Sequence, residues 1–107
     1  EFIWTRERNQ FAWDCYLGSE YLRAPFVPAR TNDLTGLPPA WIYTVTLDLF
    51  RDENIAYAQR LMRAGVATEL IVEPGACHGF TMIPETQILQ RYNAASLSAL
   101  RRAIGAR

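Results

Sequence analysis

Trp41-Ile42-Tyr43-Thr44-Val45-Thr46 is a run of aromatic and β-branched residues that contains no charge. This composition is typical of a strand that is buried on both faces of a parallel sheet. A second run, Thr68-Glu69-Leu70-Ile71-Val72-Glu73, ends at a Pro-Gly pair and predicts another strand, which its glutamates make more exposed. The residues between the two runs have helical spacing, so the order predicts two parallel strands joined by a helical crossover.

Three helices and one irregular connector are predicted along the chain. The crossover helix is expected over residues 53–64, capped by Asp52 and ended by Gly65, with an apolar stripe of Ile55, Ala58 and Met62 and with Leu61 beside it. A last helix is expected from about Pro84 to Ile104, where Gly105 ends it. An N-terminal helix is expected from Thr5, its cap, to Leu17. Residues 19–40 hold four prolines and predict an irregular connector.

We therefore predict an α/β fold in which a strand-helix-strand-helix unit follows an N-terminal helix and a proline-rich connector. Two strands alone cannot form a stable sheet whose two faces are both covered. Further strands are therefore expected from an N-terminal part of the same protein or from a second chain. The 107-residue sequence opens on Glu1-Phe2 without an initial methionine, which fits the expectation of a piece of a longer protein.

The composition excludes several classes of function. Eleven basic residues balance eleven acidic ones, so no net field would attract nucleic acid or an anionic membrane surface. No apolar run reaches the roughly 20 residues of a membrane span. Cys15 and Cys77 lie far apart without companion histidines, which argues against a metal site. They form either a disulfide or, as we prefer, two buried thiols in a reducing compartment, so a cytoplasmic location is expected.

Two residues with the chemistry of an acid and a base directly follow the two predicted strands. Asp48 comes after the first strand and His78 after the second. In open α/β sheets, ligands bind outside the carboxyl ends of the strands, so the two side chains are expected to meet within hydrogen-bonding reach. A carboxylate beside an imidazole fixes its tautomer and stabilises its protonated form, while the other ring nitrogen exchanges a proton with a nucleophile. Asp52, by contrast, is expected to serve as the helix cap.

The sequence resembles the bacterial esterases and lipases that are similar to hormone-sensitive lipase, within the α/β-hydrolase fold. The resemblance covers nearly the whole chain. It is carried by Asp33-Leu34-Thr35-Gly36-Leu37-Pro38-Pro39-Ala40, by Leu47-Asp48-Leu49-Phe50-Arg51-Asp52-Glu53, by Ala56-Tyr57-Ala58-Gln59-Arg60-Leu61 with Ala64-Gly65-Val66, and by His78-Gly79-Phe80. The family has a proline after its acidic residue, where this sequence has Leu49.

The resemblance implies that residues 1–107 form an incomplete hydrolase domain, its C-terminal segment. Asp48 would be the acid and His78 the base of a Ser-His-Asp triad, Phe80 would line the substrate pocket, and no cofactor would be needed. The family's Gly-x-Ser-x-Gly elbow and its glycine-rich oxyanion hole are absent from this sequence. The chain alone is therefore expected to be inactive on carboxylic esters and to need the missing N-terminal part. The alternative function is a non-catalytic module that oligomerises or completes another polypeptide.

Two further hypotheses concern surfaces. The aromatic residues of the N-terminal region either line an acyl pocket or pack against the missing part; they are Trp4, Phe11, Trp13, Tyr16 and Tyr21. The strand Thr68–Glu73 is expected at a sheet edge, where it pairs with its own copy in a homodimer. The resemblance supports this arrangement, because dimers of the family commonly use the last strand and the helix beside it. Glu69 and Glu73 could instead guard that edge against pairing.

Overall fold

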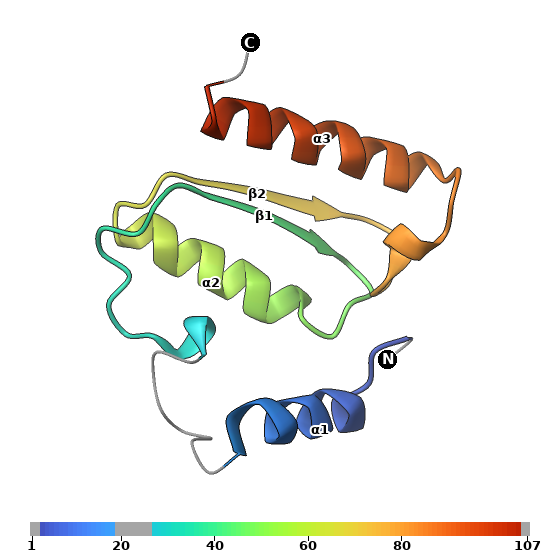
Figure 1. Ribbon diagram of the computed structural model, residues 1–107, viewed down its shortest axis with the longest axis horizontal. Coiled ribbons are helices and arrows are strands. Elements are labelled where there is room, and N and C mark those ends of the chain that lie inside the picture. Colours follow the sequence, from blue (N-terminus) through green and yellow to red (C-terminus); the bar gives the residue numbers. More distant parts are fainter. Residues whose placement is uncertain (1–2, 19–26, 106–107) are drawn as a thin grey trace.

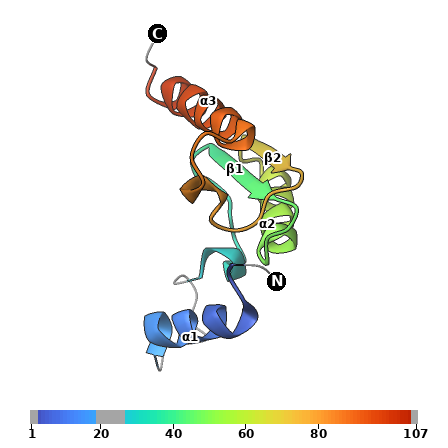
Figure 2. The ribbon, with the colours of Figure 1, turned by 90° about the vertical axis from the view of Figure 1, so that its right-hand side faces the viewer.

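A computed structural model describes residues 3–18 and 27–105 of the chain (Figure 1). Strands β1 (Ala40–Val45) and β2 (Thr68–Glu73) pair in parallel, with Ala40 opposite Thr68 and Val45 opposite Glu73. Helix α2 (Arg51–Arg63) packs on one face of this sheet and helix α3 (Gln87–Ala103) lies on the other (Figure 2). The predicted α/β unit of strand, helix, strand and helix is therefore confirmed.

The first strand is less buried than its composition predicted. Thr44 and Val45 are buried, and they face opposite sides of the sheet, so the carboxyl end of β1 is covered on both faces as expected. Residues 40–43 are only half-buried among the residues described. Glu69 and Val72 on β2 are exposed, as predicted for the second strand, but Glu73 is buried.

The hydrophobic core lies between the sheet and α2. It consists of Leu34, Leu61 and Val66, with Ala40, Ile42, Tyr57 and Ala64 packed against it. Ala58 is completely buried, but Met62 is 48% exposed, so its place in the predicted apolar stripe was wrong. The face of α2 that meets the sheet runs through Ala58 and Leu61, three residues apart, and this turns Met62 toward its flank.

The start of α2 differs from the prediction. Its N-cap residue is Phe50, whose side chain makes no capping hydrogen bond, so the assignment of Asp52 as the cap was wrong. Asp52 lies in the first turn, where its carboxylate pairs with Arg51 at 2.8 Å between Nε and Oδ1. Its negative charge also interacts favourably with the positive end of the helix dipole. The end of α2 is as predicted: Gly65 has a φ of 80°, and Val66 N–H donates to the carbonyl of Leu61.

The other two helices begin at threonine caps. Helix α1 (Arg6–Leu17) starts after Thr5, whose hydroxyl accepts from Arg8 N–H, as predicted. Helix α3 starts at Gln87 after the cap Thr86, later than the expected start near Pro84. Glu85 has a φ of 63°, which is left-handed backbone and cannot belong to an α-helix.

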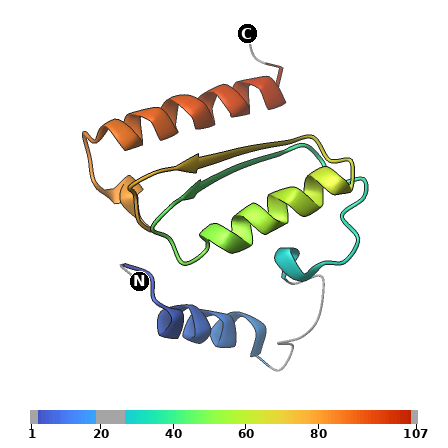
Figure 3. The same ribbon diagram turned by 180° about the vertical axis from the view of Figure 1, so that it is seen from behind.

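The connector between α1 and β1 is described from residue 27 onward and holds the short 3₁₀ turn Pro28–Arg30. The guanidinium of Arg60 donates to the carbonyls of Ala29 and Thr31, which fastens this connector to α2. Figure 3 shows α1 lying beyond α2, with its start on the side of the molecule where the strands reach their carboxyl ends. In the part of the chain that is described, no helix combines the length and apolarity needed to cross a bilayer.

Candidate active site

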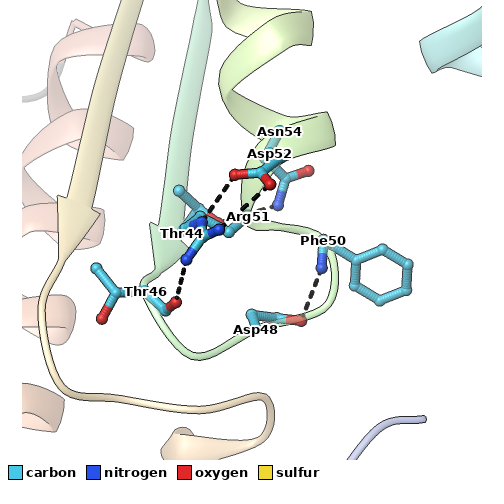
Figure 4. A network of polar contacts seen from close by, with 7 residues as sticks. All are labelled: Thr44, Thr46, Asp48, Phe50, Arg51, Asp52 and Asn54. Carbon is cyan, nitrogen blue, oxygen red and sulfur yellow. Dashed lines mark hydrogen bonds and ion pairs between the residues drawn. The ribbon is translucent and has the colours of Figure 1, made fainter. Parts of the chain in front are cut away.

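The loop after β1 holds Asp48 in a tight turn (Figure 4). Oδ1 of Asp48 accepts a hydrogen bond from Phe50 N–H at 3.1 Å, and its carbonyl accepts from Arg51 N–H at 3.3 Å. The guanidinium of Arg51 donates to the carbonyl of Thr46 at 2.8 Å. Aspartate side chains commonly accept a hydrogen bond from the backbone N–H two residues on, as Asp48 does from Phe50, and this bond fixes the direction of the carboxylate. The second carboxylate oxygen, Oδ2, remains available for another partner.

The loop after β2 is joined to the loop after β1 by two hydrogen bonds. Leu47 N–H donates to the carbonyl of Ala76 at 3.0 Å, and Gly75 N–H donates to the hydroxyl of Thr46 at 2.9 Å. Gly79 has a φ of 75°, which is left-handed backbone. A glycine adopts this conformation without strain, so the backbone directly after His78 favours glycine.

Asp48 and His78 meet at this edge of the sheet. Nδ1 of His78 lies 3.0 Å from Oδ2 of Asp48, within hydrogen-bonding reach, as the strand order predicted. The Asp48 side chain is 11% exposed and the His78 side chain 38% exposed. Asp48 can thus orient the ring and stabilise its protonated form. Among the described residues none binds Nε2 of His78, which is the nitrogen that would exchange a proton.

Two aromatic side chains contact the imidazole. The ring of Trp4 stacks on it at 5.6 Å between centroids and 30° between planes. The ring of Phe50 meets it at 5.7 Å and 63°. Trp4 belonged to the aromatic set singled out from the sequence, but no sequence signal tied it to His78, and Phe50 was not considered. A groove lined by Trp4, Phe11, Ala12 and Cys15 runs along α1, and its use as an acyl pocket stays a prediction. Tyr21 lies outside the described residues.

Phe80 packs into an aromatic cluster between β1 and α3. Its ring stacks on Tyr43 at 5.9 Å and meets Tyr92 edge to face at 5.5 Å. Trp41 joins the cluster through contacts with Tyr43 and Tyr92. Phe80 therefore contacts both β1 and α3. Its expected part in a substrate pocket stays a prediction.

A buried carboxylate that the sequence singled out only as a possible edge guard lies next to this cluster. Glu73 accepts a hydrogen bond from the Tyr43 hydroxyl at 2.8 Å and pairs with the Arg91 guanidinium. Arg91 and then Tyr43 hold the pKa of Glu73 below its ordinary value. Burial, followed by the bond to Glu73, raises the pKa of Tyr43 to about 12. This network ties the carboxyl ends of both strands to α3.

The two cysteines do not behave as one pair of buried thiols. Both are free in the structure; Cys77 is half-buried, but Cys15 is exposed, so its expected burial was wrong. The exposure follows from the position of Cys15 on a face of α1 that no described residue covers. Within residues 3–18 and 27–105, no three side chains of His, Cys, Asp or Glu gather closely enough to hold a metal ion.

Parallel strands with helices on both faces, and a carboxylate-histidine pair at the carboxyl edge, are features of the class of α/β hydrolases. A family model described as the alpha/beta hydrolase fold matches residues 1–82. Carboxylesterase NlhH of Mycobacterium tuberculosis is 38% identical over 93 residues, which are 82% of this chain and 28% of that protein. The chain belongs to the α/β-hydrolase family, among the bacterial esterases similar to hormone-sensitive lipase.

Solved structures agree with this assignment. Esterase LipW from Mycobacterium marinum matches with a TM-score of 0.87 and 42% identity, over 92% of this chain and 32% of that one. Brefeldin A esterase, described as a bacterial homologue of human hormone-sensitive lipase, matches with a TM-score of 0.55 and 26% identity, over 97% of this chain and 34% of that one. The chain therefore spans about a third or less of the length of these relatives.

Proposed function

We propose that this chain is the C-terminal segment of a carboxylic ester hydrolase and supplies the acid and the base of its Ser-His-Asp triad. The contact of 3.0 Å between Asp48 and His78 is the observation that carries the proposal. Carboxylesterase NlhH and esterase LipW are similar to this chain, and their names give the substrate class, a carboxylic ester. No cofactor takes part in this chemistry.

In the proposed reaction, a serine from the remainder of the hydrolase attacks the ester carbonyl. Nε2 of His78 takes the serine proton and returns it to the departing alcohol. Asp48 holds Nδ1 and stabilises the imidazolium that forms between these two steps. A water molecule then releases the acid from the acyl-enzyme through the same sequence of proton transfers.

The chain alone is proposed to be inactive, because neither serine of the described residues is placed for attack. Ser96 and Ser98 lie on α3, where the hydroxyl of Ser96 donates to the Asn93 carbonyl and Ser98 accepts from Arg102. Ser19 lies outside the described residues, and its sequence context has no nucleophile elbow. Without a nucleophile and donors for the oxyanion, little transition-state stabilisation remains.

The test compares ester hydrolysis by the chain alone and by the chain combined with a serine-bearing N-terminal part of the same hydrolase. We expect hydrolysis of a short nitrophenyl ester by the combination alone. In the combination, His78→Ala should lower kcat/KM by several orders of magnitude, roughly the 10³–10⁶ range found when a triad member is lost. Gln90→Ala, on an exposed position of α3, serves as the control and should have no effect. Near-normal hydrolysis by His78→Ala would contradict the proposal.

A further inference from the structure

The imidazole of His78 is held by two separate segments of the chain. From the turn between β1 and α2, Asp48 binds one ring nitrogen and Phe50 contacts the ring, and Trp4 stacks on the ring from the segment before α1. A single hydrogen bond at Nδ1 fixes a distance but leaves the ring free to turn about the bond. A stacked ring removes that freedom, because turning the imidazole would separate the two faces.

Trp4 is itself held in place by the residues around it. Its indole N–H donates to the Asn9 side-chain oxygen at 3.3 Å, and the Arg8 guanidinium donates to the Ile3 carbonyl at 2.8 Å. Ile3 reaches the loop that carries His78, since a Cβ on Gly79 would lie 3.9 Å from the Ile3 side chain. The stack is therefore anchored to α1 on one side and approaches the histidine loop on the other.

We propose that Trp4 is a positioning residue for His78: its indole face fixes the plane of the imidazole and favours the protonated ring. A cation over the face of a tryptophan within about 6 Å of the ring centre is attracted by the ring's quadrupole. The centroid distance of 5.6 Å fits this range. Since the imidazolium forms during the proposed reaction, the same contact would lower the barrier for proton transfer from the nucleophile.

Charged or titratable groups also lie on the elements that contact the ring. Asp48 lies in the turn after β1, Arg51 begins α2, Cys77 precedes His78, and Glu7 and Arg8 lie on the first turn of α1. Of these groups, Asp48 forms an ion pair with the imidazole, and Asp48 itself is not changed when Trp4 is replaced. A difference between the variants at Trp4 therefore reports the indole face.

The chain contains a single histidine, so NMR can observe the ring of His78 without any catalytic activity. The measurement is made on the 107-residue chain and on the complex in which this chain is the only labelled part. We expect Trp4→Leu to abolish the ring-current displacement that the stacked indole causes in the ring-proton signals of His78, and Trp4→Phe to retain most of it. Trp13→Leu is the matched control, because Trp13 contacts Tyr16 and not His78.

Two further measurements keep the proposal open to refutation even if Trp4→Leu does not fold. In the unchanged chain, we expect a nuclear Overhauser effect between the indole of Trp4 and the imidazole, and its absence would overturn the stack. In the complete hydrolase, Trp4→Leu should lower kcat roughly tenfold or more with little change in KM, as misplacement of a catalytic group does.

The kinetic part of this inference rests on the proposed function, whereas the NMR measurement does not. Unchanged ring-proton signals of His78 in a folded Trp4→Leu chain refute the role of Trp4, even if His78→Ala abolishes ester hydrolysis. Loss of the ring-current displacement supports the contact, even if His78→Ala proves active and the proposed function fails. The two proposals can therefore fail independently.

Discussion

Asp48 uses its two carboxylate oxygens for different tasks. Oδ1 closes the turn by accepting from Phe50 N–H, and Oδ2 faces Nδ1 of His78. The same side chain thus shapes the loop and orients the ring. A substitution that removes the whole carboxylate would affect both tasks, so a variant that preserves the turn is the more informative one.

Asp48→Asn is that variant. The amide oxygen can still accept from Phe50 N–H, but the NH₂ group then faces Nδ1 and favours the wrong tautomer of His78. We expect kcat in the complete hydrolase to fall by roughly 10³–10⁴, with the fold retained. Asp33→Asn is the matched control, because Asp33 closes a similar turn with Thr35 N–H at 2.9 Å away from the site. A loss smaller than tenfold for Asp48→Asn would argue against its role as the acid.

At the scale of elements, α3 is attached to the sheet through a carboxylate at the end of β2. Glu73 accepts from Tyr43 on β1 and pairs with Arg91 on α3. Glu69 also pairs with α3, through Arg102, but that pair is about half exposed to solvent. Both glutamates therefore face α3, and this orientation weakens the alternative that they guard the edge of the sheet.

The buried pair at Glu73 makes stability depend on pH. Its pKa in the folded chain is lowered, so its contribution is fully present above the ordinary value near 4.5 and is lost as the pH falls through the lower folded value. We expect Glu73→Gln to reduce the free energy of unfolding by about 1–2 kcal/mol at pH 7. The difference should shrink in acid, as measured by urea titrations at several pH values.

Glu69→Gln provides the comparison for that experiment, because the partially exposed pair with Arg102 should be worth less than about 1 kcal/mol. Equal losses for the two variants at pH 7, or a difference for Glu73→Gln that persists unchanged at pH 3, would contradict the assignment of Glu73 as the anchor of α3.

The elements themselves were predicted well where their signals are local. Thr5 and Gly65 mark helix ends through their own hydrogen bonds and backbone angles, and both were found from the sequence. Asp52 was misjudged as a cap because the helix starts at the residue before it. The start of α3 was missed because the left-handed backbone of Glu85 has no sequence signal as strong as a glycine.

For the molecule as a whole, strand order was enough to bring Asp48 and His78 together, because parallel neighbours end at one edge. The contact between Trp4 and His78 could not be predicted in this way. It depends on how the segment before α1 returns to the loops after β1 and β2, and nothing in the local sequence encodes that path. The partnership of Glu73 with Arg91 was hidden for the same reason.

The described residues leave much apolar surface open. Phe11 and Ile104 are more than two-thirds exposed, and the described sheet has two strands, each with a free edge. A sheet of this size is rarely stable unless further strands extend it. Under the proposed function, the N-terminal part of the hydrolase is the expected partner at the edge of β1, because β2 occupies the other edge of that strand.

We expect β2 to pair with its own copy through Thr68–Glu73, giving a homodimer. Its outer edge presents unpaired backbone donors and acceptors, while Leu70, Ile71 and Val72 supply apolar side chains beside them. Light scattering at several concentrations should show a dimer, and Val72→Lys should weaken it by bringing like charges together near the two-fold axis. Met82→Lys adds the same charge at an exposed position outside the sheet and should leave the dimer intact. A monomer at all concentrations, with amides of residues 68–73 that exchange freely with solvent, would refute this arrangement.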